Sequence, residues 1–523
     1  MTTRDIDRRR LLKAGGALSA LGAAAPFAAQ LLAAGSAAAS APGDYKALVC
    51  IYLYGANDPH NTVVATDTDS WARYFAARNT GFDPIALMPL GTAPVLAGQV
   101  SPVTGRVSGP NKPEFWGGVL PIVPATPKPI PPATAASPAR TFALHPFLGP
   151  LQSLFNQGRL AIVANVGPLI QPTSKQQYLS QSAPVPQSLF SHFDQQGAWQ
   201  VGLGQPFKIG WGGAMADKLL ASNGANPVFT AITPSGNSQP GGLSLYLAGQ
   251  IARGYSITTN AVPADVIQSV VGRMLFTSPS APATVSALIQ NTSATSNFAN
   301  DYAAVVTRSI NAATLVNAAV SAGPATTIPA APNYVNPFTG STAVNSLAQQ
   351  MQAVARQIAA APQLGISRQV FFVSMPGFDT HANQNLAHPD LLGQVAQAML
   401  YFDGALANVG GRDLRGSVTT FTASDFGRTF TTNGSGTDHG WGSHQFVMGG
   451  AVNGGNIYGD FPTLGVDSGG FSNPDMAGNA LVPKISVDQY GATLGAWMGV
   501  SSTDLANIFP NLGNFSPTNL GFV

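Results

Sequence analysis

The stretch Gln369-Val-Phe-Phe-Val-Ser374 is a short, nearly continuous apolar run, which is typical of a strand that is covered on both faces. A helical pattern from Ser346 to Ala361 precedes it. A second helical pattern, from Leu391 to Asn408, leads to a similar run, Ser417-Val-Thr-Thr-Phe-Thr-Ala423. Because strands that alternate with helices form mostly parallel sheets, this region predicts an α/β fold.

The same alternation continues outward from this region. Lys46 to Leu53 is another continuous apolar run, and we expect residues 46–54 to form a first, central strand that buries Cys50 as an inert thiol. His145-Pro146 opens a helical pattern that ends at Gln157, before a strand from Arg159 to Asn165. Further patterns predict a strand at Asn226–Ile232, helices at Val266–Phe276, Ala299–Val320 and Ser486–Met498, and a loop at Pro324–Pro337.

The length suits a single large α/β domain with insertions, or two domains, behind an export signal. We expect residues 1–39 to be the signal and residues 40–523 to form a single domain of this α/β class. Residues 80–140 are rich in Pro and Gly and predict a surface insertion. Residues 200–345, rich in Ala, Ser, Asn, Thr and Gly, predict a variable region of helices and loops.

The N-terminus has the layout of a bacterial export signal. Arg8-Arg9-Arg10-Leu11-Leu12-Lys13 precedes an Ala-rich apolar run, and Ala37-Ala38-Ala39 offers small residues for cleavage. The paired arginines resemble a twin-arginine signal, which predicts the twin-arginine export machinery as a partner and a periplasmic or extracellular location. A retained membrane anchor is the alternative, because the apolar run approaches spanning length.

The charge and the cysteine content argue against nucleic-acid binding and against disulfide bonds. Without the first 39 residues, 20 basic stand against 21 acidic residues, so no basic patch for nucleic acid is expected. Cys50 is the single cysteine, so no disulfide can form within the chain.

Acidic and imidazole side chains gather in short segments that follow the predicted strands. Asp379 and His381 come after the first run quoted above, Asp425 ends the second, and Asp438-His439 lies in a Gly-rich loop. Asp58 follows the first strand. Because the carboxyl ends of parallel strands meet at one edge, these groups can converge on one ion, since carboxylate and imidazole bind divalent metals. The alternative is that Asp and His beside Gly only form turns.

Several of these motifs occur together, in order, along nearly the whole chain. They resemble those of the domain-of-unknown-function 1501 family: Gly55-Ala-Asn-Asp58-Pro-His-Asn61, His145-Pro146, Ser191-His192-Phe193, Gly377-Phe-Asp-Thr-His381, Ser424-Asp-Phe-Gly-Arg428 and Gly436-Thr-Asp-His-Gly440. That family is grouped with the alkaline phosphatase and sulfatase superfamily. The resemblance implies an alkaline-phosphatase-like fold, a mostly parallel sheet between helices with metal at the strand ends. It also implies Asp58 as a bridging ligand, Asp379 and His381 on one metal, and Asp425 with Asp438 and His439 completing the site.

Two further residues are candidates for catalysis. The superfamily uses a Ser, Thr or oxidised Cys beside its metals, and Ser191 is the best-placed hydroxyl here, although a helix cap is the alternative role. Arg428 could bind substrate oxygens through its planar guanidinium, or pair with a carboxylate. The sulfatase signature and the Gly-x-Ser-x-Gly elbow are absent from the sequence.

The predicted function is therefore that of an exported, metal-dependent hydrolase of phosphate- or sulfate-type esters, with a small anionic ester as substrate. The metal could be Zn, Mn, Fe or Ca. The alternative is an exported binding or assembly factor that keeps the fold without catalysis and recognises a cell-envelope partner. After cleavage of the signal, we expect no stable membrane span.

Overall fold

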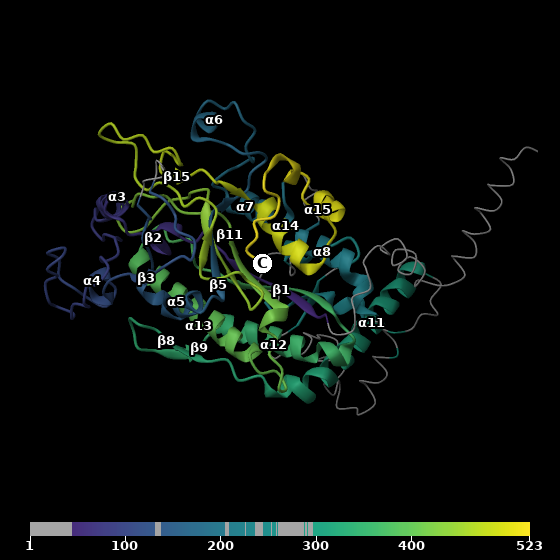
Figure 1. The fold of residues 1–523 in the computed structure, drawn as a ribbon. Helices are drawn as coiled ribbons and strands as arrows, with labels where there is room; N and C mark the ends of the chain where they lie inside the picture. Colours follow the sequence, from purple (N-terminus) through teal and green to yellow (C-terminus); the bar gives the residue numbers. More distant parts are fainter. Residues whose placement is uncertain are drawn as a thin grey trace, which may run out of the picture.

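The computed structural model describes residues 44–130, 138–203, 209–224, 226–235, 244–252, 254–257, 259, 287, 290 and 296–523. The predicted export signal at 1–39 and the predicted helix from Val266 to Phe276 lie outside the described residues. Within them, a central sheet carries helices on both faces (Figure 1).

Three adjacent parallel strands form the middle of the sheet. Strand β1 (Lys46–Leu53) pairs in parallel with β10 (Arg368–Met375) on one side and with β11 (Val418–Ser424) on the other. All but one residue of these three strands are buried, as their continuous apolar runs predict. The predicted α/β class with a central, mostly parallel sheet is confirmed.

The outer part of the sheet is mixed. Strand β12 (Ser443–Met448) runs antiparallel between β11 and β5 (Leu160–Gly167). On the other side of the centre, β6 (Ala231–Thr233) and β7 (Tyr255–Ser256) continue the parallel pairing beyond β10. Two short strands complete the sheet by pairing in parallel with β5: β13 (Asn456–Tyr458) and β16 (Ile485–Ser486).

Alternate side chains of β1 enter two different cores. Val49 and Ile51 pack in the first core, together with residues of α5 (Gly149–Asn156), α11 (Asn297–Val320), α12 (Ser346–Leu364) and α13 (Gln384–Leu406). Cys50 and Tyr52 pack in the second core, with residues of α7 (His192–Val201), α8 (Trp211–Leu219), α14 (Val487–Met498) and α15 (Ser502–Ile508). This alternation follows from the twofold period of a strand, and the two helical layers are visible on opposite sides of the sheet in Figure 1.

Smaller elements lie outside the main sheet. In the predicted 80–140 insertion, part of the chain packs inward: Ile85, Ala86, Leu87 and Met88 are buried. The segment also adds β3 (Leu120–Ile122) to a small sheet with β4 (Phe142–Leu144) and β2 (Val63–Ala65). The remaining elements are α3 (Thr68–Arg78), α4 (Pro113–Trp116), α6 (Lys175–Leu179), β8 (Asn333–Val335), β9 (Thr342–Val344), β14 (Met476–Ala477), β15 (Ala480–Leu481), and 3₁₀ helices at Pro59–Asn61, Pro146–Leu148, Leu220–Asn223, Pro227–Thr230, Leu245–Leu247, Gly323–Thr327, Arg415–Ser417 and Leu512–Asn514.

Several predicted boundaries need correction. Helix α13 begins at Gln384, seven residues before the predicted Leu391, and contains Pro389. The predicted strand at Asn226–Ile232 is mostly a 3₁₀ helix, and only its end belongs to β6. The predicted loop at Pro324–Pro337 contains the first strand of the β8–β9 hairpin.

One helix of the described part, α11, is long and apolar enough to cross a membrane by length and composition. Ala312, Val316 and Val320 of this helix are buried in the first core.

Candidate metal centre

The carboxyl ends of the three central strands deliver acidic residues to one edge of the sheet. The register places Leu53 of β1 opposite Met375 of β10 and opposite Ser424 of β11, so the segments that follow these strands start side by side. Asp425 directly follows β11, and Asp379 follows β10 after Gly377. Gly55, with a φ of +105°, lets the end of β1 pass against Asp379, because an added Cβ would lie 2.4 Å from the backbone N of Asp379.

A hairpin-like loop between β11 and β12 brings Asp438 and His439 to the same edge. Arg428 and His439 form an isolated antiparallel bridge, and the backbone N–H of Thr429 donates to the carbonyl of Asp438 at 2.9 Å. The loop packs tightly against the segment after β10 at Gly436, where an added Cβ would lie 2.3 Å from the carbonyl oxygen of Thr380. Only glycine, which has no side chain, allows this close approach.

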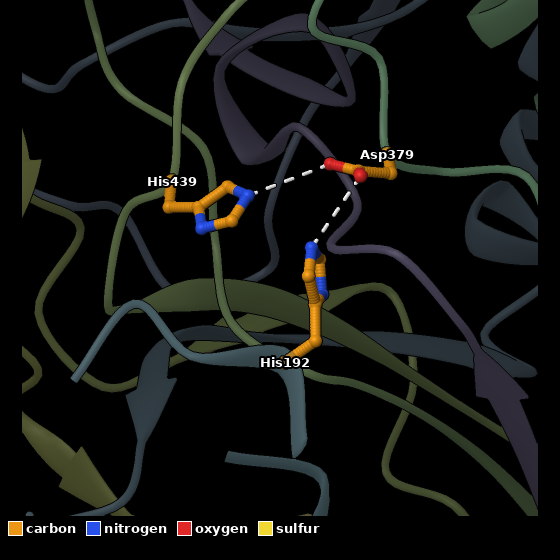
Figure 2. Close-up of side chains that lie close together, drawn as sticks. All are labelled: His192, Asp379 and His439. Atoms are coloured by element: carbon orange, nitrogen blue, oxygen red, sulfur yellow. Dashed lines mark ion pairs between the residues drawn. The ribbon is translucent and has the colours of Figure 1, made fainter. Parts of the chain in front are cut away.

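Four side chains from three separate segments converge at this edge. Figure 2 shows His192, Asp379 and His439 pointing toward one another, and their ligand atoms lie within 4.8 Å of each other. His381 joins them: its Nε2 lies 2.8 Å from Nε2 of His439 and 3.2 Å from Oδ1 of Asp379. The side chains of these four residues are 24–46% exposed, so solvent and small molecules can reach them.

Each of the three histidines is held from behind through its Nδ1 atom. His192 Nδ1 lies 2.7 Å from Oδ2 of Asp425, His381 Nδ1 lies 3.1 Å from Oδ1 of Asp438, and His439 Nδ1 lies 2.6 Å from the carbonyl oxygen of Phe190. An ionised carboxylate or a carbonyl can only accept, so Nδ1 carries the proton in all three rings. The Nε2 atoms of the three rings face the carboxylate of Asp379.

This arrangement is the one that metal-binding histidines adopt. A ligating imidazole usually donates its second N–H to a carboxylate or a backbone carbonyl, which fixes its tautomer and orientation. The 2.8 Å between two Nε2 atoms would set two lone pairs against each other unless a proton or a cation lies between them. Three imidazoles and one carboxylate fit a divalent ion such as Zn, Fe or Mn better than Ca, which takes oxygen ligands.

The electrostatics of the cluster depend on buried partners. The hydrogen bond to Asp425 raises the pKa of His192. Burial lowers the pKa of His439, which favours its neutral, ligating form. Burial opposes the ionisation of Asp379, but the hydrogen bond and charge of Arg428, whose Nη1 donates to Oδ1 at 2.7 Å, outweigh it and lower the pKa of Asp379.

Of the six predicted metal ligands, Asp379, His381 and His439 lie in the cluster itself. Asp425 and Asp438 lie behind it and orient His192 and His381. Oδ2 of Asp425 also accepts from Gln196 Nε2 at 2.9 Å and from the backbone N–H of Gly55 at 3.2 Å, so this oxygen is fully engaged.

Asp58 is engaged elsewhere. It is fully buried, and its two oxygens accept from Arg78 Nη1 at 2.5 Å and from Arg78 Nη2 at 3.0 Å, with Gln384 Nε2 at 2.6 Å from Oδ2. As a bridging metal ligand, Asp58 therefore stays a prediction that would require Arg78 and Gln384 to release it.

The two predicted catalytic residues have structural contacts. Ser191 is the N-cap of α7, and its hydroxyl accepts from the backbone N–H of Asp194 at a long 3.5 Å. Arg428 is fully buried and uses its guanidinium on Asp379 and on the carbonyl of Thr437. Arg428 thus supports the cluster from beneath, and Ser191 stands directly before His192.

The residue that sequence reasoning missed is His192. It lies 187 positions before Asp379, at the start of a helix, where only Ser191 was given a role. The Ser191-His192-Phe193 motif was the available signal. Phe190, just before it, has a φ of +74°, an unusual backbone conformation for a non-glycine residue, and its carbonyl contacts His439.

The fold and the cluster together define an α/β protein with a histidine–carboxylate centre at the carboxyl edge of a mostly parallel sheet. The chain belongs to the family described as "Protein of unknown function (DUF1501)", whose model matches residues 45–509. No curated protein and no solved structure matches the chain.

Proposed function

We propose that this protein is a metal-dependent hydrolase of phosphate- or sulfate-type esters. The observation that carries the proposal is the common geometry of His192, His381 and His439. Each ring is anchored through Nδ1 and turns Nε2 toward the carboxylate of Asp379. Three separately anchored imidazoles whose Nε2 atoms face one carboxylate match the way in which metal-binding histidines are held.

The four residues of the cluster would hold one divalent ion. Such an ion polarises an ester oxygen and lowers the pKa of a bound water or hydroxyl. Arg428 keeps Asp379 ionised by hydrogen bonding, and Asp425 keeps His192 in the ligating tautomer. Ser191 is the candidate nucleophile, because its hydroxyl makes only one long hydrogen bond and its backbone adjoins His192.

The wider setting is part of the same proposal. We place the fold in the alkaline phosphatase and sulfatase superfamily, as the strand-end motifs suggest. The basic N-terminal segment would send the protein through the twin-arginine machinery to the periplasm or beyond. Because this route exports folded proteins, the centre could take up its metal before export.

Metal content and turnover test this function directly. The soluble protein is purified after expression of the full chain, its metals are measured by mass spectrometry, and phosphate and sulfate esters are screened. We expect about one ion per chain, which His192→Ala and His439→Ala lose. Asp413→Asn, which changes an exposed carboxylate paired with Arg415, should bind metal normally. A protein that binds no metal and turns over no ester would contradict the proposal.

A second function, an exported binding or assembly factor, is favoured by one observation. The ion pair between Asp58 and Arg78 uses the carboxylate that the family resemblance implies as a bridging ligand. A stoichiometric partner that copurifies from the periplasm, and stays bound when metal is chelated, would favour this function over hydrolysis.

A further inference from the structure

Exposed phenylalanines occur on the segments that adjoin the metal centre. Among the described residues, four phenylalanines are exposed: Phe82 at 84%, Phe190 at 36%, Phe193 at 78% and Phe298 at 83%. The first three lie on segments that contact the centre, whereas Phe298 lies on α11. Isolated exposed apolar residues are normal, but exposed apolar side chains that gather at one place mark a binding surface.

Two of the three flank His192 in the sequence. Phe190 supplies the carbonyl oxygen that holds His439 at 2.6 Å, so its backbone is part of the centre. Phe193 directly follows His192 in the first turn of α7. Beneath these residues the centre is already aromatic, because the buried ring of Phe426 lies 4.8 Å from His192 and 4.7 Å from His439 between ring centroids.

The third phenylalanine reaches the centre from another segment. The ring of Phe82 lies over Gly434, where an added Cβ would be 3.2 Å from a ring carbon. The backbone N–H of Asp83 donates to the carbonyl of Gly434 at 2.9 Å, which fixes this contact. The neighbouring Asn433 donates to Oδ1 of Asp438 and to the carbonyl of His381, so Phe82 borders the loop that carries the centre.

Apolar residues on adjoining segments therefore accompany the charged groups of the centre. Removing an exposed phenyl ring from water is favourable, and the free protein leaves these rings uncovered. Ligand sites commonly join apolar and aromatic walls to a few polar groups that fix orientation. An occupant that matches both features has an anionic ester head and an apolar group attached to it.

We infer that the substrate is an ester of an apolar alcohol, with its aryl or alkyl group lying against Phe82, Phe190 and Phe193. This inference rests on the proposed hydrolase function and names the substrate class of that same site. Hydrophilic esters, such as those of sugars or glycerol, would leave the three rings exposed and gain nothing from them.

Binding of two matched, non-hydrolysable probes tests the inference. The purified, metal-loaded protein is titrated calorimetrically with 2-phenylethyl phosphonate and with ethyl phosphonate, which share one head group. We expect the phenylethyl compound to bind about tenfold more tightly, as one or two kcal/mol of buried apolar area would give. A matching long-alkyl phosphonate distinguishes an alkyl from an aryl preference.

Variants assign the preference to the proposed residues. Phe82→Ser combined with Phe193→Ser should reduce the tenfold difference to about twofold or less, because the apolar contact is removed. Phe298→Ser, equally exposed but on α11, should leave the difference unchanged. Phe190 is not altered, because its backbone holds His439.

The outcomes distinguish failure of the inferred substrate class from failure of the proposed hydrolase function. If ethyl phosphonate binds and the phenylethyl compound binds no better, the function stands and the substrate class is wrong. The same holds if the preference survives in the double variant. If neither phosphonate binds the metal-loaded protein, the hydrolase function fails, and the substrate class fails with it.

Discussion

At the scale of single residues, the centre is governed by the acceptors behind its histidines. Asp425 is fully buried and holds His192, whereas Asp438 is 61% exposed and holds His381. A buried acceptor orients its partner more firmly than an exposed one, because water competes less for the hydrogen bond. The two carboxylates should therefore differ in their effect on metal binding, although each would act on the proposed ion through one histidine.

Replacing these two acceptors gives the first prediction. Asp425→Asn should weaken metal affinity by roughly 10–100-fold, which is typical for the loss of such a partner, and Asp438→Asn should have a smaller effect. Competition with a fluorescent chelator measures both affinities, with Asp413→Asn as the control. Equal losses in the two variants would mean that burial does not set the contribution of these carboxylates.

Asp488 provides a prediction that is independent of the centre. It is buried in the first turn of α14, and burial raises its pKa from 3.8 to about 7. Between these two pH values the folded state binds more protons than the unfolded state. The contribution of Asp488 to stability is therefore fully present below pH 3.8 and is lost as the pH rises toward 7. Fully developed, the loss is roughly 4 kcal/mol.

The neutral Asp488→Asn should therefore be more stable than the parent protein at pH 8, by up to about 4 kcal/mol. Its advantage should shrink steadily toward pH 4. Urea unfolding of both proteins at pH 5 and pH 8 measures this, and a constant difference across the two pH values would contradict the assigned cause.

The centre could be predicted in part from residue types and spacing. Asp379, His381 and His439 lie on strand ends and a Gly-rich loop, which is where sequence patterns direct attention. Their separation into ligands and supporting groups could not be predicted, because it depends on side-chain distances of a few Å. Arg78 is the clearest case: nothing in its helical sequence shows that it pairs with Asp58.

At the scale of elements, the strands with nearly unbroken apolar runs could be predicted best. Strands β1, β10 and β11 lie within one residue of the predicted boundaries because each is a nearly unbroken apolar run. Strand β12 was not predicted, since Ser443-His444-Gln445 gives it a polar start; tertiary pairing with β11 and β5 forms it instead. Its His444 accepts from the backbone N–H of Asn165 at 3.1 Å.

Helix α13 is longer at its N-terminus than its local sequence predicts. The predicted start at Leu391 lies after Pro389, whereas the helix begins at Gln384 and includes this proline. The first turn is held by long-range hydrogen bonds instead: Asn385 Nδ2 donates to the carbonyl of Pro84 at 3.0 Å, and His388 Nε2 lies 2.9 Å from Oδ1 of Asn57. Such contacts between distant segments cannot be predicted from local patterns.

Ser191 is the N-cap of α7 and the proposed nucleophile, and a single variant separates these two roles. Glycine keeps an N-cap within a few tenths of a kcal/mol but removes the hydroxyl. If Ser191 is the nucleophile, Ser191→Gly should lower turnover at least about a thousandfold, while the unfolding free energy changes little. Steady-state kinetics and urea unfolding check the two parts. Undiminished turnover would instead assign the attack to water.

At the scale of the whole molecule, the centre lies where the two helical layers and the carboxyl edge of the sheet meet. Two of its carboxylates have partners without any ion, because Arg428 pairs with Asp379, and His192 and Gln196 hydrogen-bond to Asp425. The central strands beneath it are buried on both faces and do not depend on the metal. The metal-free protein should therefore stay folded, and metal should add stability only by binding the folded state.

That reasoning gives the last prediction. At a free metal concentration of about 100 times Kd, the native state gains about 2.7 kcal/mol, which should raise Tm by roughly 2–3 °C in a chain of this size. Calorimetry with metal and with chelator measures the shift.

His439→Ala should melt at the same temperature under both conditions, because its ion is lost, whereas Asp413→Asn should respond like the parent protein. Collapse of the fold on chelation would mean that metal is structural, and an unchanged Tm in the parent protein would mean that the anchored histidines hold no ion.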